Sequence, residues 1–98
     1  MIRGTTPTHN FTIPFDVSFI ADLRISYAQT KEVLTKTKED CTLNDKTITV
    51  KLSQEDTFKF DCSKNVKVQV RILTIEKEVV SSEPYIIKVG ECLNNEVL

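Results

Sequence analysis

The chain has few of the residues on which many functional sites depend. Among its 98 residues there are two glycines, one histidine and no tryptophan. Because the glycines are Gly4 and Gly90, neither of the common glycine-rich phosphate-binding motifs can be present. The turns between them must be built from Asn, Asp, Lys or Ser.

The chain also lacks an excess of charge and a long apolar run. Thirteen basic and 14 acidic residues leave a net charge of −1, which provides no field to hold a polyanion, so nucleic acid is not an expected partner. No run of about 18 apolar residues is present, so we expect no membrane insertion. Residues 1–8 contain no apolar signal-peptide segment, so we do not expect secretion by that route.

An odd number of cysteines argues against a closed disulfide framework. Cys41, Cys62 and Cys92 are most simply reduced thiols of a cytosolic product, although the sequence does not fix their redox state. The nearest two are 21 residues apart, whereas structural zinc ligands are usually paired two to four residues apart. We therefore predict no zinc site.

The acidic residues show no pattern typical of a site either. No segment has the D-x-[DN]-x-[DN]-G spacing of a calcium loop, and no tryptophan or glycine-lined groove supports a sugar-cleaving carboxylate pair. We expect solvated loop charges at Glu39, Asp40, Glu55, Asp56 and Asp61.

His9 is the only histidine, and it precedes the first predicted strand. Nucleophilic catalysis needs an imidazole held by packing and by a third group, and a terminal flank is a poor place for that. We expect an exposed or half-buried polar side chain. No catalytic, metal-binding or cofactor-binding residue is predicted, and a ligand-binding site is left unassigned.

Alternation of polar and apolar residues is the clearest signal in the chain. Residues 47–52 alternate without a fault, which predicts a half-buried strand with Ile48, Val50 and Leu52 inward. Ser53 followed by Asp56 resembles a capping box, with Asp in place of the usual Glu, and predicts one helical turn. Phe58 or Phe60 is expected to close the end of the core.

Similar alternation predicts the other strands, and the inward residues of the two clearest are Leu23, Ile25 and Tyr27 and then Val66, Val68, Val70 and Ile72. Pro14 lies within the first predicted strand and should make it an edge strand or end it in a bulge. Asn44-Asp45 favours a tight turn between two later strands. With residues 47–52, the set gives about seven short strands, with no room for crossover helices: 10–15, 22–27, 32–36, 41–43, 66–72 and a last strand that begins at 79–80 and finishes at 85–89. We expect a kink at 81–84.

Basic residues are expected on the outer faces of these strands. Lys67 and Arg71 should point outward on one strand, and Lys51 and Lys88 should lie elsewhere on the surface. The five phenylalanines fall on or near predicted core faces, so no platform for stacking bases is expected. Lysines at strand edges prevent those edges from pairing with another chain, which is sufficient to account for these basic residues.

The segment Asp56-Thr57-Phe58-Lys59-Phe60-Asp61-Cys62 has the spacing of the D-[ST]-A-x-Y-x-C segment of immunoglobulin domains. Phe60 lacks the corner hydroxyl, Cys41 is too close in sequence to be the usual disulfide partner, and no core tryptophan exists. We therefore reject an antibody-type domain. The expected fold is all-β: one immunoglobulin-like antiparallel β-sandwich over residues 1–98, with a flexible N-terminus at 1–8.

The C-terminal tail, residues 91–98, carries Leu93, Val97 and Leu98. It can pack on the domain, fray or dock on a neighbour. We expect a frayed or lightly packed tail.

Several segments together resemble a known family. They are Thr8-x-x-Phe11-x-x-Pro14-Phe15-Asp16, Ile25-Ser26-Tyr27-Ala28-Gln29, Asp40-Cys41-Thr42-Leu43, Ile48–Thr57 and Val70-Arg71-Ile72-Leu73-Thr74. This set, over about residues 5–93, is similar to small uncharacterised proteins of phages and prophages of Gram-positive bacteria. Those proteins resemble the immunoglobulin-like N-terminal domains of phage baseplate and tail-fibre proteins. The corner at 52–57 is the most specific piece.

The resemblance implies a non-enzymatic structural or accessory protein associated with a phage tail or baseplate. Its partners would be other phage structural proteins, with a homo-oligomer also open, and its location the virion or the host cytoplasm during assembly. Free strand edges would supply the contacts. The alternative is a module that binds a host surface glycan or a host protein.

Overall fold

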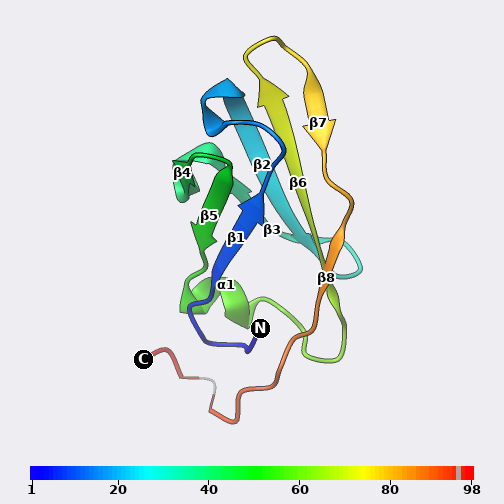
Figure 1. Ribbon diagram of the computed structural model, residues 1–98. Coiled ribbons are helices and arrows are strands. Elements are labelled where there is room, and N and C mark those ends of the chain that lie inside the picture. Colours follow the sequence, from blue (N-terminus) through cyan, green and yellow to red (C-terminus); the bar gives the residue numbers. More distant parts are fainter. Residues whose placement is uncertain (95) are drawn as a thin grey trace.

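Eight strands form two antiparallel sheets in the computed structural model, which describes residues 1–94 and 96–98 (Figure 1). A single α-helical turn, α1 (Gln54–Phe58), and two 3-10 turns, η1 (Val17–Phe19) and η2 (Lys38–Asp40), connect them. The strands are β1 (Thr8–Thr12), β2 (Ile20–Ala28), β3 (Glu32–Thr37), β4 (Cys41–Asn44), β5 (Thr47–Lys51), β6 (Val66–Thr74), β7 (Val79–Ser81) and β8 (Tyr85–Ile87).

The sheets have three and five strands. The smaller has the order β1-β5-β4, and the larger has the order β3-β2-β6, with β7 and β8 both paired to the far edge of β6. Eight strands therefore occupy seven positions, which agrees with the prediction of about seven. The chain crosses between the sheets after β1, after β3 and after β5, where α1 makes the crossing. This all-β arrangement is elongated, at 46 × 26 × 16 Å.

Side chains that alternate along the central strands fill the space between the sheets. The residues predicted to point inward are buried, and they come from both sheets: Ile48, Val50 and Leu52 from β5 and the segment after it, Leu23, Ile25 and Tyr27 from β2, and Val66, Val68, Val70 and Ile72 from β6. Burying these apolar side chains is the main stabilising contribution.

The corner after β5 has the predicted capping box. Ser53 Oγ accepts a hydrogen bond from the Asp56 backbone N–H at 3.1 Å, and an Asp56 carboxylate oxygen accepts one from the Ser53 N–H at 3.0 Å. These bonds satisfy amide groups that the first turn of α1 leaves without helical partners. Phe60 follows and is 1 % exposed, so it closes this end of the core as predicted.

The first strand lies two residues earlier than the sequence indicated. β1 covers Thr8–Thr12 instead of 10–15, and its ladder ends where the Ile13 N–H donates to the Lys46 carbonyl at 2.8 Å. Pro14 comes next, and its lack of an N–H fits an edge strand, because the N–H of residue 14 would face away from β5. At the other end Pro7 offers a carbonyl, which accepts from the Leu52 N–H at 3.0 Å and lengthens the strand backward.

Two other local predictions need adjustment. The turn after β4 is centred on Asp45-Lys46, one residue later than expected, and Asp45 has the positive φ of 52°. Phe19, expected near a core face, is 45 % exposed. It ends η1, and the turn brings the next residue, Ile20, into the core instead.

The predicted kink near Pro84 separates β7 from β8. In the intervening segment the Ser82 hydroxyl accepts a hydrogen bond from the Val70 N–H at 3.0 Å, and the Ser82 carbonyl accepts one from the Gln69 side chain at 3.1 Å. Side-chain bonds thus replace part of the ladder where the strand is interrupted.

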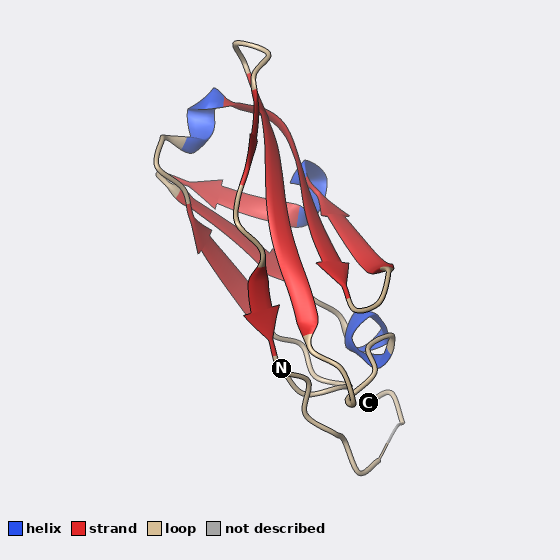
Figure 2. Ribbon diagram, turned by 90° about the vertical axis from the view of Figure 1, so that its right-hand side faces the viewer, coloured by secondary structure: helices blue, strands red, loops and turns tan. Residues whose placement is uncertain are grey.

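Both ends of the chain lie at the end of the molecule that carries α1 (Figure 2). Ile2 pairs with Gly90 in a short parallel bridge, and the N-terminal ammonium donates to the Lys88 carbonyl at 3.0 Å. The last residue, Leu98, is held by two hydrogen bonds to the Gln54 side chain, while its own side chain is exposed. The flexibility expected at 1–8 and 91–98 stays a prediction.

Candidate binding groove

A groove runs along β1, between the edge of the smaller sheet and the β7–β8 edge of the larger one. Two adjoining hollows of about 370 and 540 Å³ form it, and they share Phe11, Thr12 and Tyr85. Phe11 from β1 and Tyr85 from β8 meet across it, with ring centroids 5.8 Å apart. We name this feature the β1 groove.

The edge of β1 that borders the groove has free backbone groups. The ladder bonds at Pro7 and Ile13 fix the alternation, so every second residue between them points toward β5. Thr8, Asn10 and Thr12 therefore direct their N–H and C=O groups away from β5. No hydrogen bond joins these backbone groups to any other part of the chain that the structure describes.

His9 and Tyr27 form a polar contact beside the groove. His9 is half-buried on β1, and its Nδ1 lies 2.7 Å from the hydroxyl of the fully buried Tyr27 on β2. Burial, and to a smaller extent the N-terminal charge, lowers the pKa of His9. Burial also raises the pKa of Tyr27 far above its usual range. Which of the two groups donates depends on which ring nitrogen of His9 carries the proton.

This contact joins the two sheets across the core. The sequence indicated that His9 would be exposed or half-buried, and the second is observed. Its pairing with Tyr27 was not predicted, because it depends on how β1 and β2 are placed in different sheets. Alternation placed Tyr27 inward, and a buried tyrosine hydroxyl usually needs a partner; this was the one available signal.

An ion pair holds α1 against the larger sheet. Lys36 Nζ of β3 lies 2.8 Å from an Asp56 carboxylate oxygen, and both side chains are largely buried. Burial alone would raise the pKa of Asp56, but the bonds to Lys36 and Ser53 outweigh it and leave that pKa lowered. Asp56 forms the turn as predicted, but the expectation that it is a solvated loop charge is wrong, because its side chain is buried in the ion pair between two elements.

The cysteines lie apart and are free thiols. Burial raises the pKa of the Cys41 thiol, and Asp40 adds to this effect. A raised pKa is the opposite of what activates a cysteine nucleophile. Cys62 is exposed, and Cys92 Sγ donates to the Asn94 carbonyl.

The remaining predicted residues are dispersed over the surface. Within residues 1–94 and 96–98, no three His, Cys, Asp or Glu side chains come close enough to hold a metal ion. The acidic residues predicted to be loop charges lie in separate elements of the structure. Four of them are exposed: Glu39 and Asp40 in η2, Glu55 in α1 and Asp61 after Phe60. Lys67 and Arg71 point outward on β6 as predicted, and Lys51 and Lys88 are exposed elsewhere.

Of the described residues, no helix is long and apolar enough to cross a membrane. Comparisons with protein-family models, with curated proteins and with solved structures gave no match to this chain.

Proposed function

We propose that the chain is a non-enzymatic structural or accessory protein of a phage or prophage, associated with the tail or baseplate. On this proposal it binds another virion protein through the free edge of β1. The observation that carries the binding mode is the row of unpaired backbone groups at Thr8, Asn10 and Thr12 beside the β1 groove. The phage setting rests on the resemblance of the sequence segments described above.

The order of the strands supports an immunoglobulin-like fold as part of this proposal. Immunoglobulin sandwiches have strands A-B-E-D in one sheet and G-F-C, with C′ in some, in the other. The order β1-β5-β4 corresponds to B-E-D, and β7/β8-β6-β2-β3 corresponds to G-F-C-C′. α1 lies between E and F, where the corner of that fold occurs.

On this correspondence, no strand of the described chain takes the place of strand A beside β1. The N-terminal residues pair with Gly90 instead. An extended segment from a partner could therefore add to the sheet at β1, as in β-augmentation, with main-chain hydrogen bonds giving affinity. Alternate side chains of that segment would enter the two hollows beside the contact between Phe11 and Tyr85.

Mass spectrometry of purified particles tests the biological part of the proposal. The particles and their assembly intermediates would come from the induced host whose genome carries this chain. The proposal predicts the chain in one of these fractions at a fixed ratio to tail proteins. Its absence from both fractions, with the chain expressed, would contradict it.

A further inference from the structure

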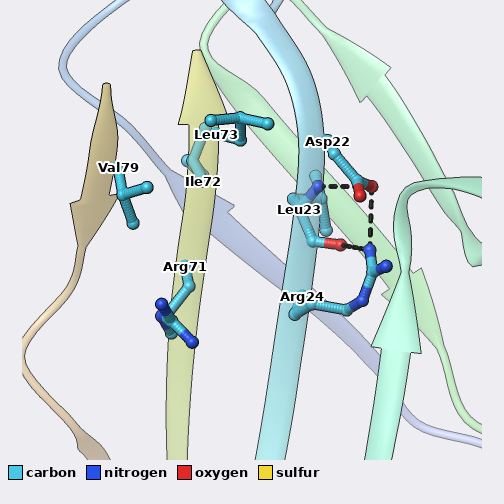
Figure 3. Close-up of a pocket in the computed structure, with 7 residues that line it drawn as sticks. All are labelled: Asp22, Leu23, Arg24, Arg71, Ile72, Leu73 and Val79. Atoms are coloured by element: carbon cyan, nitrogen blue, oxygen red, sulfur yellow. Dashed lines mark hydrogen bonds and ion pairs between the residues drawn. The ribbon is translucent and has the colours of Figure 1, made fainter. Parts of the chain in front are cut away.

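Two arginines occupy neighbouring positions on the outer surface of the larger sheet, and their side chains extend in different directions (Figure 3). Arg24 of β2 and Arg71 of β6 are directly opposite in the antiparallel register, and both are exposed (Figure 3). Residues opposite each other on one face have Cβ atoms roughly 5 Å apart, and like charges in that position destabilise a sheet. Arg24 turns toward Asp22, which offsets its charge, so Arg71 is the one of the two that has no acidic partner within residues 1–94 and 96–98 (Figure 3).

Only one of the two guanidinium groups has an acidic partner. Arg24 Nη1 donates to Asp22 at 2.8 Å and to the Leu23 carbonyl at 2.8 Å. Arg71 makes no side-chain hydrogen bond or ion pair with any residue in 1–94 or 96–98. Two arginines and one aspartate leave an excess of one positive charge at this position.

Both arginines line a shallow hollow of about 250 Å³. Leu73 and Val79, which are 38 % and 61 % exposed, lie at the end of it next to the β6–β7 hairpin (Figure 3). An unpaired guanidinium beside exposed aliphatic side chains offers charge and apolar contact together. A free anion would use only the charge, whereas a protein segment would use both the charge and the apolar contact.

We propose that this hollow binds a carboxylate side chain of a partner protein, with Arg71 as the main contact and Arg24 as a second cation. The planar guanidinium matches a carboxylate through two parallel hydrogen bonds. Leu73 and Val79 contact aliphatic residues next to that carboxylate. Asp22 disfavours a dianionic phosphate in the same place, because it adds a third negative charge at short range.

This inference rests on the proposed function only in that the partner is a protein, and it concerns a face of the molecule other than the β1 groove. Failure of one can be told from failure of the other, because the variants used here leave the β1 edge unchanged.

The test is an NMR titration of the ¹⁵N-labelled full chain with a short peptide that alternates Val and Glu. The matched control peptide has Gln in place of Glu. We expect the Nε–Hε signals of Arg71 and Arg24 to shift with the Glu peptide, with a Kd on the order of 1 mM, and to shift little with the Gln peptide.

Variants on one strand separate a specific contact from general charge attraction. Arg71→Gln should weaken binding of the Glu peptide about tenfold, whereas Lys67→Gln, which removes a charge from the same face of β6, should change it less than twofold. Equal effects of the two variants would overturn the proposal. So would equal shifts with both peptides, or tighter binding of inorganic phosphate than of the Glu peptide.

Discussion

Replacing Asp56 by Ala should destabilise the protein by removing two interactions in the corner after β5. The substitution removes the carboxylate that accepts from the Ser53 N–H and that pairs with Lys36 at 2.8 Å. Loss of a capping side chain costs about 1 kcal/mol. Loss of one partner of a buried ion pair costs about 3–5 kcal/mol, because the other charge stays buried.

The geometry reduces the second cost. The Lys36 and Asp56 side chains are 17 % and 12 % exposed, so the lysine ammonium can reach water by a small movement. We therefore expect Asp56→Ala to lower the free energy of unfolding by about 2–4 kcal/mol. A domain of this size has about 5–15 kcal/mol in total, so the variant should still fold.

Urea unfolding followed by circular dichroism measures this difference. Asp56→Asn is the matched control, because it keeps an oxygen for the Ser53 N–H and removes the charge, so it should lose less than Asp56→Ala. A double-mutant cycle with Lys36→Met should give a coupling energy of about 1–3 kcal/mol. A loss below about 0.5 kcal/mol for Asp56→Ala, within the range of ordinary surface changes, would refute the reasoning.

Three further predictions concern a glycine, the histidine and the thiols. Gly4→Ala should cost about 1–3 kcal/mol in urea unfolding, because Gly4 has φ +78° and an added Cβ would lie 2.6 Å from a Phe58 ring carbon; no loss would contradict this. The pKa of His9 is lowered in the folded protein, so the unfolded chain binds a proton first as the pH falls. The free energy of unfolding should therefore decrease below about pH 6.5 and level off at the folded pKa. The same pH dependence of stability in His9→Gln would contradict this. Cys62 is exposed and burial raises the pKa of Cys41, so iodoacetamide at pH 8 should label Cys62 first by mass spectrometry, and the reverse order would be contrary to the structure.

The regular part of the fold could be predicted because its signals are local. Period-two alternation placed Val66, Val68, Val70 and Ile72 on the core face of β6, and all four are buried. The capping box needed only the spacing of Ser53 and Asp56. Pro14 indicated that the first strand lies at an edge or ends in a bulge, and β1 is an edge strand of the smaller sheet.

The features that define the candidate sites depend on distant parts of the chain. The contact between His9 and Tyr27 requires knowing that their strands lie in different sheets. The opposition of Arg24 and Arg71 requires the register of β2 against β6, which a one-residue slip would remove. Neither pairing leaves a mark in a single sequence.

The most direct test of the central proposal compares Asn10→Pro with Asn10→Ala in purified particles. The Asn10 N–H points away from β5, so proline there removes an outward donor without removing a ladder bond. Both variants lose the hydrogen bond between the side chains of Asn10 and Thr49, which makes alanine the matched control. Thermal unfolding by circular dichroism would first establish that both variants fold.

Quantitative mass spectrometry of the particles then gives the ratio of the chain to the tail proteins. Binding through the β1 edge predicts that Asn10→Ala is incorporated like the unmodified chain and that Asn10→Pro is lost at least tenfold. Equal incorporation of the two folded variants would contradict the account.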